Sequence, residues 1–491
     1  LSIDVGTSST RAAVIQADGQ VQALGGASYT PETPQSGWCE QNPEEWWKGA
    51  CSAVREALDA PGIQTSQLAG IAVCGQMHSP VPLSASGEVL LDRVQLWNDK
   101  RPDAQVRKFL AQPRSRKICR RQGNPAACSW SAFKLAWMRQ YQPSVFQKTW
   151  KFLTPKDFIN YRLTGVAATD FTEASGSFFC SVRSGSYDEE VVQEFGVHSE
   201  QLPEIRNPEH VLGGLREDMA RELGLPSGLP VVAGCGDFPA SLLGSGVCSP
   251  GESAEITGTS TLLATLVEAP SFNSRVGHIR SALGGWIQFA VIDAGGESIR
   301  WARNVLGDAS RFADIDTMAA SIEPGCGGLL FLPYLNGERL GGVVNSRAQF
   351  FGITAAHSRQ HCYRSVMEGV AFAARRSLEA LDDVSPQLIA SGGGARSDVW
   401  LNMKASVYQL PLRVPENTES GLLGAAILAG TGVGCFSKPT AGVDQMVRIQ
   451  SEYFPDPELV AFYERSYRVF EQLYQSSQAL YGVLDTLHEV P

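Results

Sequence analysis

Two short turns of the same composition, one in each half of the chain, have residues suited to holding phosphate. Gly6-Thr7-Ser8 follows a short apolar run near the start of the sequence, and Gly258-Thr259-Ser260 follows a similar run in the second half. Glycine leaves backbone N–H groups unhindered and the hydroxyls add donors, so a pair of such turns could clamp a polyphosphate from two sides. Taken singly, each turn also has the composition of an ordinary hairpin.

Two charged residues flank the first turn. Asp4 lies two residues before Gly6, where a carboxylate could hold Mg²⁺ through water. Arg11 follows the turn, where a guanidinium could offset phosphate charge. An aspartate in this place can equally fix a turn by local hydrogen bonds, so both interpretations of Asp4 stay open.

Asp237 is a candidate general base. The strand-like run 229–233 ends in Gly234-Cys235-Gly236, and the carboxylate of Asp237 comes next, followed by Phe238 and Pro239. A carboxylate at the carboxyl end of a strand, in the mouth of an α/β cleft, is well placed to take a hydroxyl proton and, with Asp4, to bind a metal ion. An aspartate two residues before a proline is also an ordinary helix N-cap, which is the competing interpretation.

Two polar segments follow strand-like runs and predict a site for a polyhydroxylated molecule. One is Gly75-Gln76-Met77-His78 and the other is Trp97-Asn98-Asp99-Lys100-Arg101. Amide, imidazole, carboxylate, guanidinium and indole groups together suit hydrogen bonding to hydroxyls and stacking on a ring. The candidate substrate-binding residues are Gln76, Met77, His78, Trp97, Asp99, Arg101 and Phe238.

A glycine turn in the second half predicts contact with a nucleotide. The strand-like run 388–391 leads into Gly392-Gly393-Gly394, and residues 398–408 read as a helix that carries Asn402 as a further candidate contact. Three glycines allow flat backbone contact with a base or ribose, although neither a Walker P-loop nor a GxGxxG fingerprint is present here.

Strand-like and helix-like stretches alternate along the chain, which predicts an α/β fold. Residues 1–5, 11–16 and 20–24 read as a meander, residues 43–58 as a helix, and residues 68–73 as a buried strand. Most candidate site residues therefore lie at, or just after, the end of a strand.

The two phosphate-type turns raise the hypothesis that the halves of the chain are related. Gly6 and Gly258 are 252 residues apart in a chain of 491 residues. Two copies are weak evidence for a repeat, and coincidence among common turn residues is the alternative. We expect two lobes, residues 1–246 and 247–491, divided within the small-residue stretch 244–251.

Three other stretches are expected to be structural. Residues 457–482 have apolar residues at helical spacing and predict a long packing helix, and residues 419–426 open an apolar helix whose main role is packing. His357 and His361 lack the glutamate of an HExxH motif, so we expect them on a solvated helix face rather than at a metal.

Composition excludes several classes of protein. Of the residues, 43% are hydrophobic, which supports substantial cores, and 41 Lys and Arg against 51 Asp and Glu give a net charge of −10. Such a charge disfavours nucleic acid and anionic membranes as partners, and no apolar run is long enough to span a bilayer. The 11 scattered cysteines, without a CxxC pair, indicate a soluble protein of the reducing cytoplasm.

These motifs together resemble one family over nearly the whole chain, the FGGY carbohydrate kinases, with the xylulokinases as the nearest branch. The resemblance rests on Ile3–Ser8, Gly37–Trp47, Gly75–His78, Trp97–Arg101, Pro155–Asp157, Gly258–Ser260, Phe331–Arg339, Phe351–Ile353, Glu368–Val370 and Gly392–Ser397. It implies an actin/hexokinase-like (ribonuclease H-like) fold of two lobes with a central cleft.

The resemblance also implies the chemistry. Asp237 would be the base that deprotonates a terminal hydroxyl, Asp4 would lie near Mg²⁺, and the two turns would hold the phosphates of ATP. Met77, His78 and Asp99 match positions that line the sugar site, and D-xylulose is the expected substrate, giving D-xylulose 5-phosphate. Members of the family are often dimers, so a homodimer is one expectation.

One departure bears on the substrate. Xylulokinases usually follow the catalytic Asp with Asn, whereas Phe238 stands here and cannot bond a hydroxyl. The alternatives are therefore a kinase for ribulose, L-xylulose, gluconate, glycerol or another polyol, and a sugar-sensing pseudokinase of the same fold. A chaperone-like or filament-forming nucleotide switch is a further alternative, which the sugar-type segments disfavour.

Overall fold

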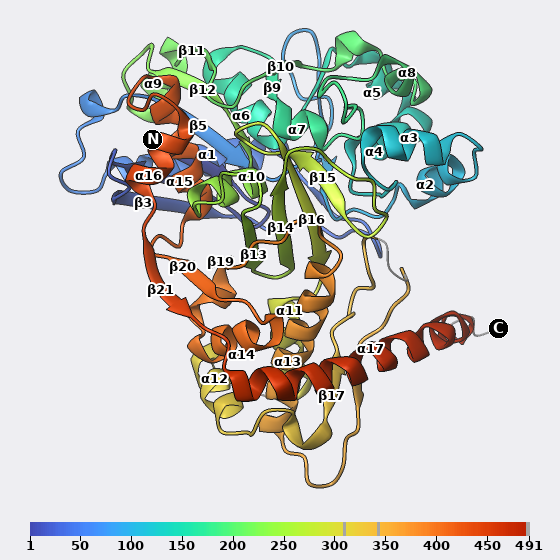
Figure 1. Ribbon diagram of the computed structural model, residues 1–491. Coiled ribbons are helices and arrows are strands. Elements are labelled where there is room, and N and C mark those ends of the chain that lie inside the picture. Colours follow the sequence, from blue (N-terminus) through green and yellow to red (C-terminus); the bar gives the residue numbers. More distant parts are fainter. Residues whose placement is uncertain (308–310, 341–343, 488–491) are drawn as a thin grey trace.

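The structure, a computed structural model, describes residues 1–307, 311–340 and 344–487 and has two lobes, each built around one large sheet (Figure 1). The N-terminal sheet has the order β11-β12-β5-β1-β2-β3. Its strands are β11 (Val211–Gly214), β12 (Pro230–Gly236), β5 (Ile71–Gly75), β1 (Ser2–Val5), β2 (Ser9–Ile15) and β3 (Val21–Ser28).

The C-terminal sheet has the order β15-β16-β14-β13-β19-β20-β21. Its strands are β15 (Gly277–Arg280), β16 (Trp286–Ile292), β14 (Thr261–Val267), β13 (Ser253–Thr257), β19 (Leu388–Ser391), β20 (Leu412–Pro415) and β21 (Ile449–Tyr453). The expected α/β fold with two lobes is confirmed.

The two sheets share one topology. In each, the first strand pairs antiparallel with the next strand along the chain and parallel with a later one: β1 pairs with β2 and β5, and β13 pairs with β14 and β19. A further parallel strand follows in each sheet, β12 beside β5 and β20 beside β19. The two Gly-Thr-Ser turns join the equivalent pairs β1–β2 and β13–β14, which favours related halves over coincidence.

Helices cover both sheets and fill the junction between the lobes. The helices are α1 (Pro43–Leu58), α2 (Asp103–Leu110), α3 (Ser115–Gln122), α4 (Ser131–Tyr141), α5 (Pro143–Lys148), α6 (Pro155–Thr164), α7 (Phe171–Ser175), α8 (Glu189–Glu194), α9 (Glu217–Leu223), α10 (Asp237–Gly244), α11 (Gly296–Val305), α12 (Phe312–Ala320), α13 (Arg359–Leu378), α14 (Asp398–Tyr408), α15 (Ser420–Gly432), α16 (Pro439–Met446) and α17 (Pro457–Thr486). Short strand pairs are β4 (Glu40–Gln41) with β7 (Val94–Gln95), β6 (Val81–Leu83) with β8 (Lys151–Leu153), β9 (Ala168–Asp170) with β10 (Glu204–Arg206), and β17 (Leu330–Leu332) with β18 (Gln349–Phe351).

Helices α10 and α15 pack against each other at the junction of the lobes. A Cβ on Gly424 would lie 2.0 Å from the carbonyl oxygen of Ala240, and one on Gly244 would lie 2.0 Å from that of Ser420. Only glycine lets the two backbones approach so closely. The predicted packing role of the segment 419–426 agrees with this arrangement, and α10 begins at the candidate base.

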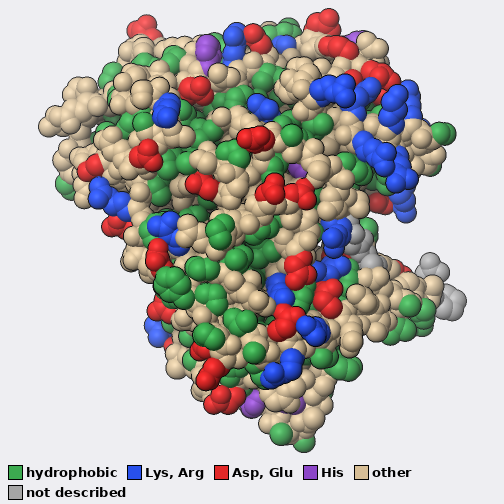
Figure 2. All heavy atoms as spheres, in the orientation of Figure 1, with side chains coloured by type: hydrophobic (Ala, Val, Ile, Leu, Met, Phe, Trp, Pro, Cys, Tyr) green, Lys and Arg blue, Asp and Glu red, His purple; other side chains and the backbone are tan. Residues whose placement is uncertain are grey.

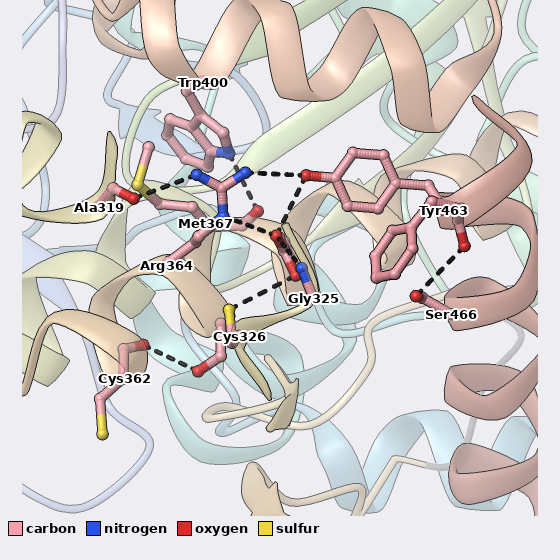
Figure 3. A network of polar contacts seen from close by, with 12 residues as sticks. Ala319, Gly325, Cys326, Cys362, Arg364, Met367, Trp400, Tyr463 and Ser466 are labelled. Carbon is pink, nitrogen blue, oxygen red and sulfur yellow. Dashed lines mark hydrogen bonds and ion pairs between the residues drawn. The ribbon is translucent and has the colours of Figure 1, made fainter. Parts of the chain in front are cut away.

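A buried polar network holds α17 against α13 (Figure 3). Glu368 accepts hydrogen bonds from Arg364 Nε at 2.9 Å, Tyr463 OH at 3.1 Å and Gly325 N at 3.0 Å. Arg364 Nη1 also donates to the carbonyl oxygen of Ala319 at 3.1 Å. These contacts confirm the predicted packing helix, whose last turns extend away from the body of the C-terminal lobe (Figure 1).

The surface carries both charges, with one local concentration. Figure 2 shows acidic and basic side chains mixed over most of the visible face, whereas Lys and Arg gather over α2 and α3, which include Arg116, Lys117 and Arg120. Among the described helices, none combines the length and apolar character needed to cross a lipid bilayer.

The prediction for the histidine pair was partly wrong. His357 lies in the turn before α13, and its Nδ1 accepts from Thr354 N at 2.8 Å. Of the two histidines, His361 alone is in the helix, and its Nδ1 accepts from Ser358 N at 3.1 Å. No group of three or more metal-ligating side chains occurs within the described residues, at this pair or elsewhere.

Candidate active site

Asp4 lies on β1 beside the first phosphate-type turn. Its Oδ2 accepts a hydrogen bond from Arg11 Nη2 at 3.0 Å, and Arg11 also forms an ion pair with Glu419, which precedes α15. Because Asp4 and Arg11 are cross-strand neighbours, the carboxylate pairs across the β1–β2 hairpin rather than fixing its turn. The other oxygen, Oδ1, is buried and has no hydrogen-bond partner among the described residues.

Asp237 is the first residue of α10, immediately after β12. The N-cap of the helix is Gly236, and Asp237 Oδ1 accepts from the neighbouring Phe238 N at 2.7 Å, so the side chain does not act as the alternative N-cap. Gly236 lies opposite Gly75 of β5, which in turn lies opposite Val5 of β1. The ends of these three parallel strands therefore bring Asp4 and Asp237 to one edge of the sheet.

Burial is the main reason that the pKa of Asp237 is raised, to about 7, and the negative charge of Asp4 raises it further. A carboxylate with such a pKa holds and releases a proton near neutrality, which is the property that a general base requires.

Met77 and His78 lie just after the end of β5, and Met77 contacts the strand that leads to Asp237. His78 has a left-handed backbone with φ of 68°, and its Nδ1 donates to the carbonyl oxygen of Gly176 at 2.8 Å. Burial lowers the pKa of His78 to about 3, so the ring is neutral and Nε2 is its acceptor nitrogen. A Cβ on Gly236 would lie 2.5 Å from Met77 Sδ, which shows how closely Met77 packs against the strand that carries Asp237.

Lys134 of α4 holds the backbone at His78. Its Nζ donates to the carbonyl oxygens of His78 at 2.9 Å and Ser129 at 2.7 Å, and burial lowers its pKa to about 7. Lys134 was missed by sequence reasoning, although a single lysine between Phe133 and Leu135 in an apolar helix was a usable signal.

The predicted residues Asp99 and Arg101 are engaged with each other. Asp99 accepts from Arg101 N at 2.9 Å and from Cys39 N at 2.7 Å, while Arg101 Nη2 donates to Glu40 at 2.7 Å. The guanidinium also lies 3.7 Å from the ring centroid of Trp38. Both side chains thus hold the loop that presents Trp97, and their direct contact with a substrate stays a prediction.

Trp97 connects the two lobes. Its Nε1 donates to Thr7 Oγ1 at 3.0 Å, and Thr7 Oγ1 also lies 3.3 Å from Gln76 Oε1, which joins the first turn to the candidate sugar residues. The guanidinium of Arg339, from the C-terminal lobe, lies 4.7 Å from the Trp97 ring and forms an ion pair with Asp293. Sequence reasoning did not pick Arg339 for this place, because the contact depends on how the lobes pack.

The second turn is braced by the start of α11. Gly296 N donates to the carbonyl oxygen of Gly258 and Glu297 N to that of Thr259, each at 3.0 Å. Because Asp293 lies just before this helix, the ion pair with Arg339 joins the neighbourhood of the second turn to that of the first. The structure therefore links the two predicted turns through Trp97, Arg339 and Asp293.

The glycine turn borders a cavity of about 420 Å³. Gly392 has φ of 80°, and a Cβ there would lie 2.6 Å from the carbonyl oxygen of Thr257. The cavity is also lined by Ser391, Arg396, Asn417, Ser451 and Tyr453. Asn402 does not line this cavity: it lies on the exposed side of α14, where its Nδ2 donates to the carbonyl oxygen of Asp398 at 2.9 Å, and its contact with a nucleotide stays a prediction.

Phe238 faces the other lobe. Its ring is half-buried and meets Phe289 of β16 edge to face, with centroids 5.6 Å apart. The ring thus packs at the contact between α10 and the C-terminal sheet.

Comparisons with known proteins identify the family. The N-terminal domain of the FGGY family of carbohydrate kinases matches residues 1–244, and its C-terminal domain matches residues 254–433. The chain belongs to the FGGY family of carbohydrate kinases. Sugar kinases of this family use ATP, so the enzyme is an ATP-dependent carbohydrate kinase.

Individual relatives agree on the fold and differ in substrate. The xylulose kinase of Bacillus subtilis (strain 168) is 27% identical, with 100% of this chain and 99% of that protein covered. The xylulose kinase structure from Rhodospirillum rubrum is 29% identical with a TM-score of 0.89, covering 98% of this chain and 99% of that one. The gluconate kinase structure from Lactobacillus acidophilus is 25% identical with a TM-score of 0.90, covering 98% of each chain.

Proposed function

We propose that this FGGY kinase transfers the γ-phosphoryl group of ATP to a terminal hydroxyl of a ketopentose, with D-xylulose as its preferred substrate. The observation that carries the proposal is that Asp4, Asp237 and the segment with Met77 and His78 lie at or just after the carboxyl ends of the adjacent parallel strands β1, β12 and β5. The first Gly-Thr-Ser turn lies at the same edge, and the second is linked to it through Arg339. These positions support a site with a base, a phosphate cradle and polyol-binding groups.

In this mechanism Asp237 takes the proton of the attacking hydroxyl. The oxygen then attacks the γ-phosphorus in line as the bond to the β-phosphate breaks, and the backbone N–H groups of the two turns stabilise the charge on the phosphates. The neutral His78 offers Nε2 as an acceptor that orients a sugar hydroxyl. The pKa of Asp237 near 7 leaves a large share of this base ionised at neutral pH.

The acidic residues fit a magnesium ion. Asp4 Oδ1 is buried and unpartnered among the described residues, and Asp237 lies close enough for the charge of Asp4 to raise its pKa. Mg²⁺ in kinases is held by one or two carboxylates, with phosphate oxygens and water completing its shell. When bound, the ion would neutralise charge on the phosphates of ATP.

The C-terminal lobe would hold the nucleoside. The cavity lined by Gly392 lies at the end of β19, and β19 pairs with β13, the strand that leads into the second turn. This supports Gly392, with Gly393 and Gly394 next to it, as the nucleotide side of the site. We place the division between a sugar-binding lobe and an ATP-binding lobe after residue 246.

The charges near the sugar residues favour a neutral ketose over an aldonate. Arg101 is neutralised by Asp99 and Glu40, and Arg339 by Asp293, so these two guanidinium groups are already paired with carboxylates. The ring of Phe238 packs against Phe289. This contact supports the interpretation that Phe238 can stand in place of the usual Asn without changing the substrate. Gluconate is the second candidate, because a gluconate kinase is as similar in structure as the xylulose kinases.

A substrate panel tests the proposal. ADP release and the mass of the product are measured with Mg·ATP and D-xylulose, L-xylulose, D-ribulose, L-ribulose, gluconate, glycerol and erythritol in turn. We expect D-xylulose to give the highest kcat/KM. Highest turnover on gluconate would replace the ketose assignment, and no phosphorylated product with any of them would refute the kinase assignment.

A further inference from the structure

The strand that carries Asp237 has an irregularity just before the candidate base. The pairing of β12 with β5 shifts register between Val232 and Cys235. Gly234, inside this bulge, has φ of 68°, and a Cβ there would lie 1.8 Å from the carbonyl oxygen of Val73. Bulges bend a strand and redirect the side chains that follow. The direction of this strand end, and of Asp237 after it, therefore depends on the contacts that hold the bulge.

Buried side chains outside the sheet hold the bulge. The carbonyl oxygen of Ala233 accepts from Asn160 Nδ2 at 2.7 Å and from Lys156 Nζ at 3.2 Å. At the end of the strand, Gly236 N donates to Thr172 Oγ1 at 3.0 Å. The Gly236 amide is thus fixed by a side chain, and Asp237 is the next residue.

Thr172 is itself anchored by a buried ionic cluster. Asp170 is the N-cap of α7, and its Oδ1 accepts from Thr172 N at 2.7 Å. The other oxygen of Asp170, Oδ2, lies 2.8 Å from Lys156 Nζ. Lys156 also pairs with Asp157, and all three charged side chains have 0% exposure. A cluster that is fully buried and mutually paired can hold one geometry, because moving any member would leave a charge without its partner.

The same segment contacts two other parts of the protein. The carbonyl oxygen of Gly176 accepts from His78 Nδ1 at 2.8 Å, and Ser175 Oγ accepts from Arg280 N, on β15 of the C-terminal lobe, at 2.7 Å. Residues 170–176 therefore contact the strand of the base, the candidate sugar-binding histidine and the opposite sheet.

We infer that Thr172 is a positioning residue for Asp237, and that the Lys156–Asp157–Asp170 cluster fixes Thr172 in turn. This inference rests on the proposed role of Asp237 as the base. Without the Thr172 hydroxyl, the Gly236 N–H is buried without an acceptor and the strand end moves. A displacement of about 1 Å at a reacting group costs on the order of 10²-fold in rate.

The test compares Thr172→Val, which keeps the size of the side chain and removes the acceptor, with Thr172→Ser, which keeps the acceptor. Thr265→Val is the matched control, because Thr265 is a fully buried threonine of β14 whose hydroxyl bonds Ser253 Oγ at 2.9 Å in the other sheet. We expect Thr172→Val to lower kcat about 10- to 100-fold with KM values for ketose and ATP within about twofold. Thr172→Ser should retain most of the kcat of the unmodified enzyme. Thr265→Val should lower Tm by about as much as Thr172→Val does, but it should not lower kcat.

Three results overturn the inference. The first is that Thr172→Val and Thr265→Val have the same kcat. The second is that Thr172→Ser loses as much kcat as Thr172→Val. The third is that Thr172→Val changes KM and leaves kcat unchanged. Asp237→Ala separates this failure from that of the proposed function. If Asp237→Ala retains turnover, the base assignment fails; if it is inactive while Thr172→Val is normal, only the inference fails.

A second measurement does not need turnover. Hydrogen exchange of the peptide that covers residues 231–240 should quicken in Thr172→Val relative to the rest of the N-terminal sheet, because the Gly236 amide loses its acceptor. Unchanged exchange in this peptide would contradict the inference even in an inactive protein.

Discussion

At the scale of single residues, the account depends on an aspartate that burial keeps close to protonation. Asp237 is at a strand end, it accepts a hydrogen bond from the Phe238 amide, and its pKa is raised to about 7 by burial and by Asp4. A surface aspartate, with a pKa near 4, would be ionised across the whole neutral range. With Asp237 as the proposed base, we therefore expect the reaction to be sensitive to pH.

The pH dependence can be predicted from this shift. Because the base must be ionised to accept a proton, kcat/KM for the ketose should fall as pH decreases through about 7 and level off above it. The measurement is a profile of kcat/KM from pH 5.5 to 9 at saturating Mg·ATP. A profile that stays flat down to pH 5.5 would mean that Asp237 is not the ionising group.

Several site residues could be predicted from the sequence because their signals are local. Asp4, Gly6, Asp237 and Gly392 each adjoin an apolar strand pattern that ends in small residues, and the structure places each at a strand end. Thr172 gives no such signal. Its contact with Gly236 joins residues 64 apart in sequence, and the hydroxyl is one of many in the chain.

At the scale of elements, local signals gave good boundaries where caps are present. Residues 398–408 form α14 as predicted, with Ser397 accepting from Trp400 N as the N-cap, and α1 begins after Asn42 in the same way. The strand predicted over 20–24 instead continues to Ser28, because Gly25 and Gly26 stay paired with β2. A Cβ on Gly25 would lie 2.2 Å from the carbonyl oxygen of Ala53, so this glycine serves close packing against α1 and not a turn.

The network around Glu368 gives a prediction about stability. Glu368→Gln removes a buried charge from the contact between α13 and α17 and leaves Arg364 without its ion-pair partner, which typically costs about 3–5 kcal/mol. Urea unfolding should show this loss with little change in kcat, since the network is remote from the candidate base. Glu45→Gln, whose partner Lys48 is exposed, is the control and should cost under about 1 kcal/mol. Equal losses in the two variants would contradict the packing role.

At the scale of the whole molecule, the candidate site lies where the two lobes meet, since Arg339 of the C-terminal lobe lies over Trp97 of the N-terminal lobe. The shared topology could be anticipated from the repeated turn, but the contacts between lobes could not. Arg11 meets Glu419 across 408 residues, and Arg339 lies over Trp97 only because of how the lobes pack. Pairings of this kind carry no periodic or local signal in the sequence.

The contact between Arg339 and Trp97 predicts an effect on coupling. Arg339→Met removes the guanidinium that joins Asp293 to Trp97, so the lobes should close less completely and water should reach the cleft more easily. The expected result is a several-fold rise in the ratio of ADP formed to sugar phosphate formed. Arg311→Met, which removes an exposed pair with Asp314, is the control and should leave this ratio unchanged. An unchanged ratio in both variants would show that the contact does not govern closure.

The most direct test of the central claim is ketose-dependent ADP formation by Asp237→Asn at pH 8. This variant keeps the shape of the side chain and removes the group that accepts the proton. We expect a fall in kcat of about 10²- to 10⁴-fold, with a Tm no lower than that of the unmodified enzyme, because the raised pKa of Asp237 means that its buried charge destabilises the fold at pH 8. A variant that retains more than about a tenth of the original kcat, well outside the range expected for loss of a general base, would contradict the account.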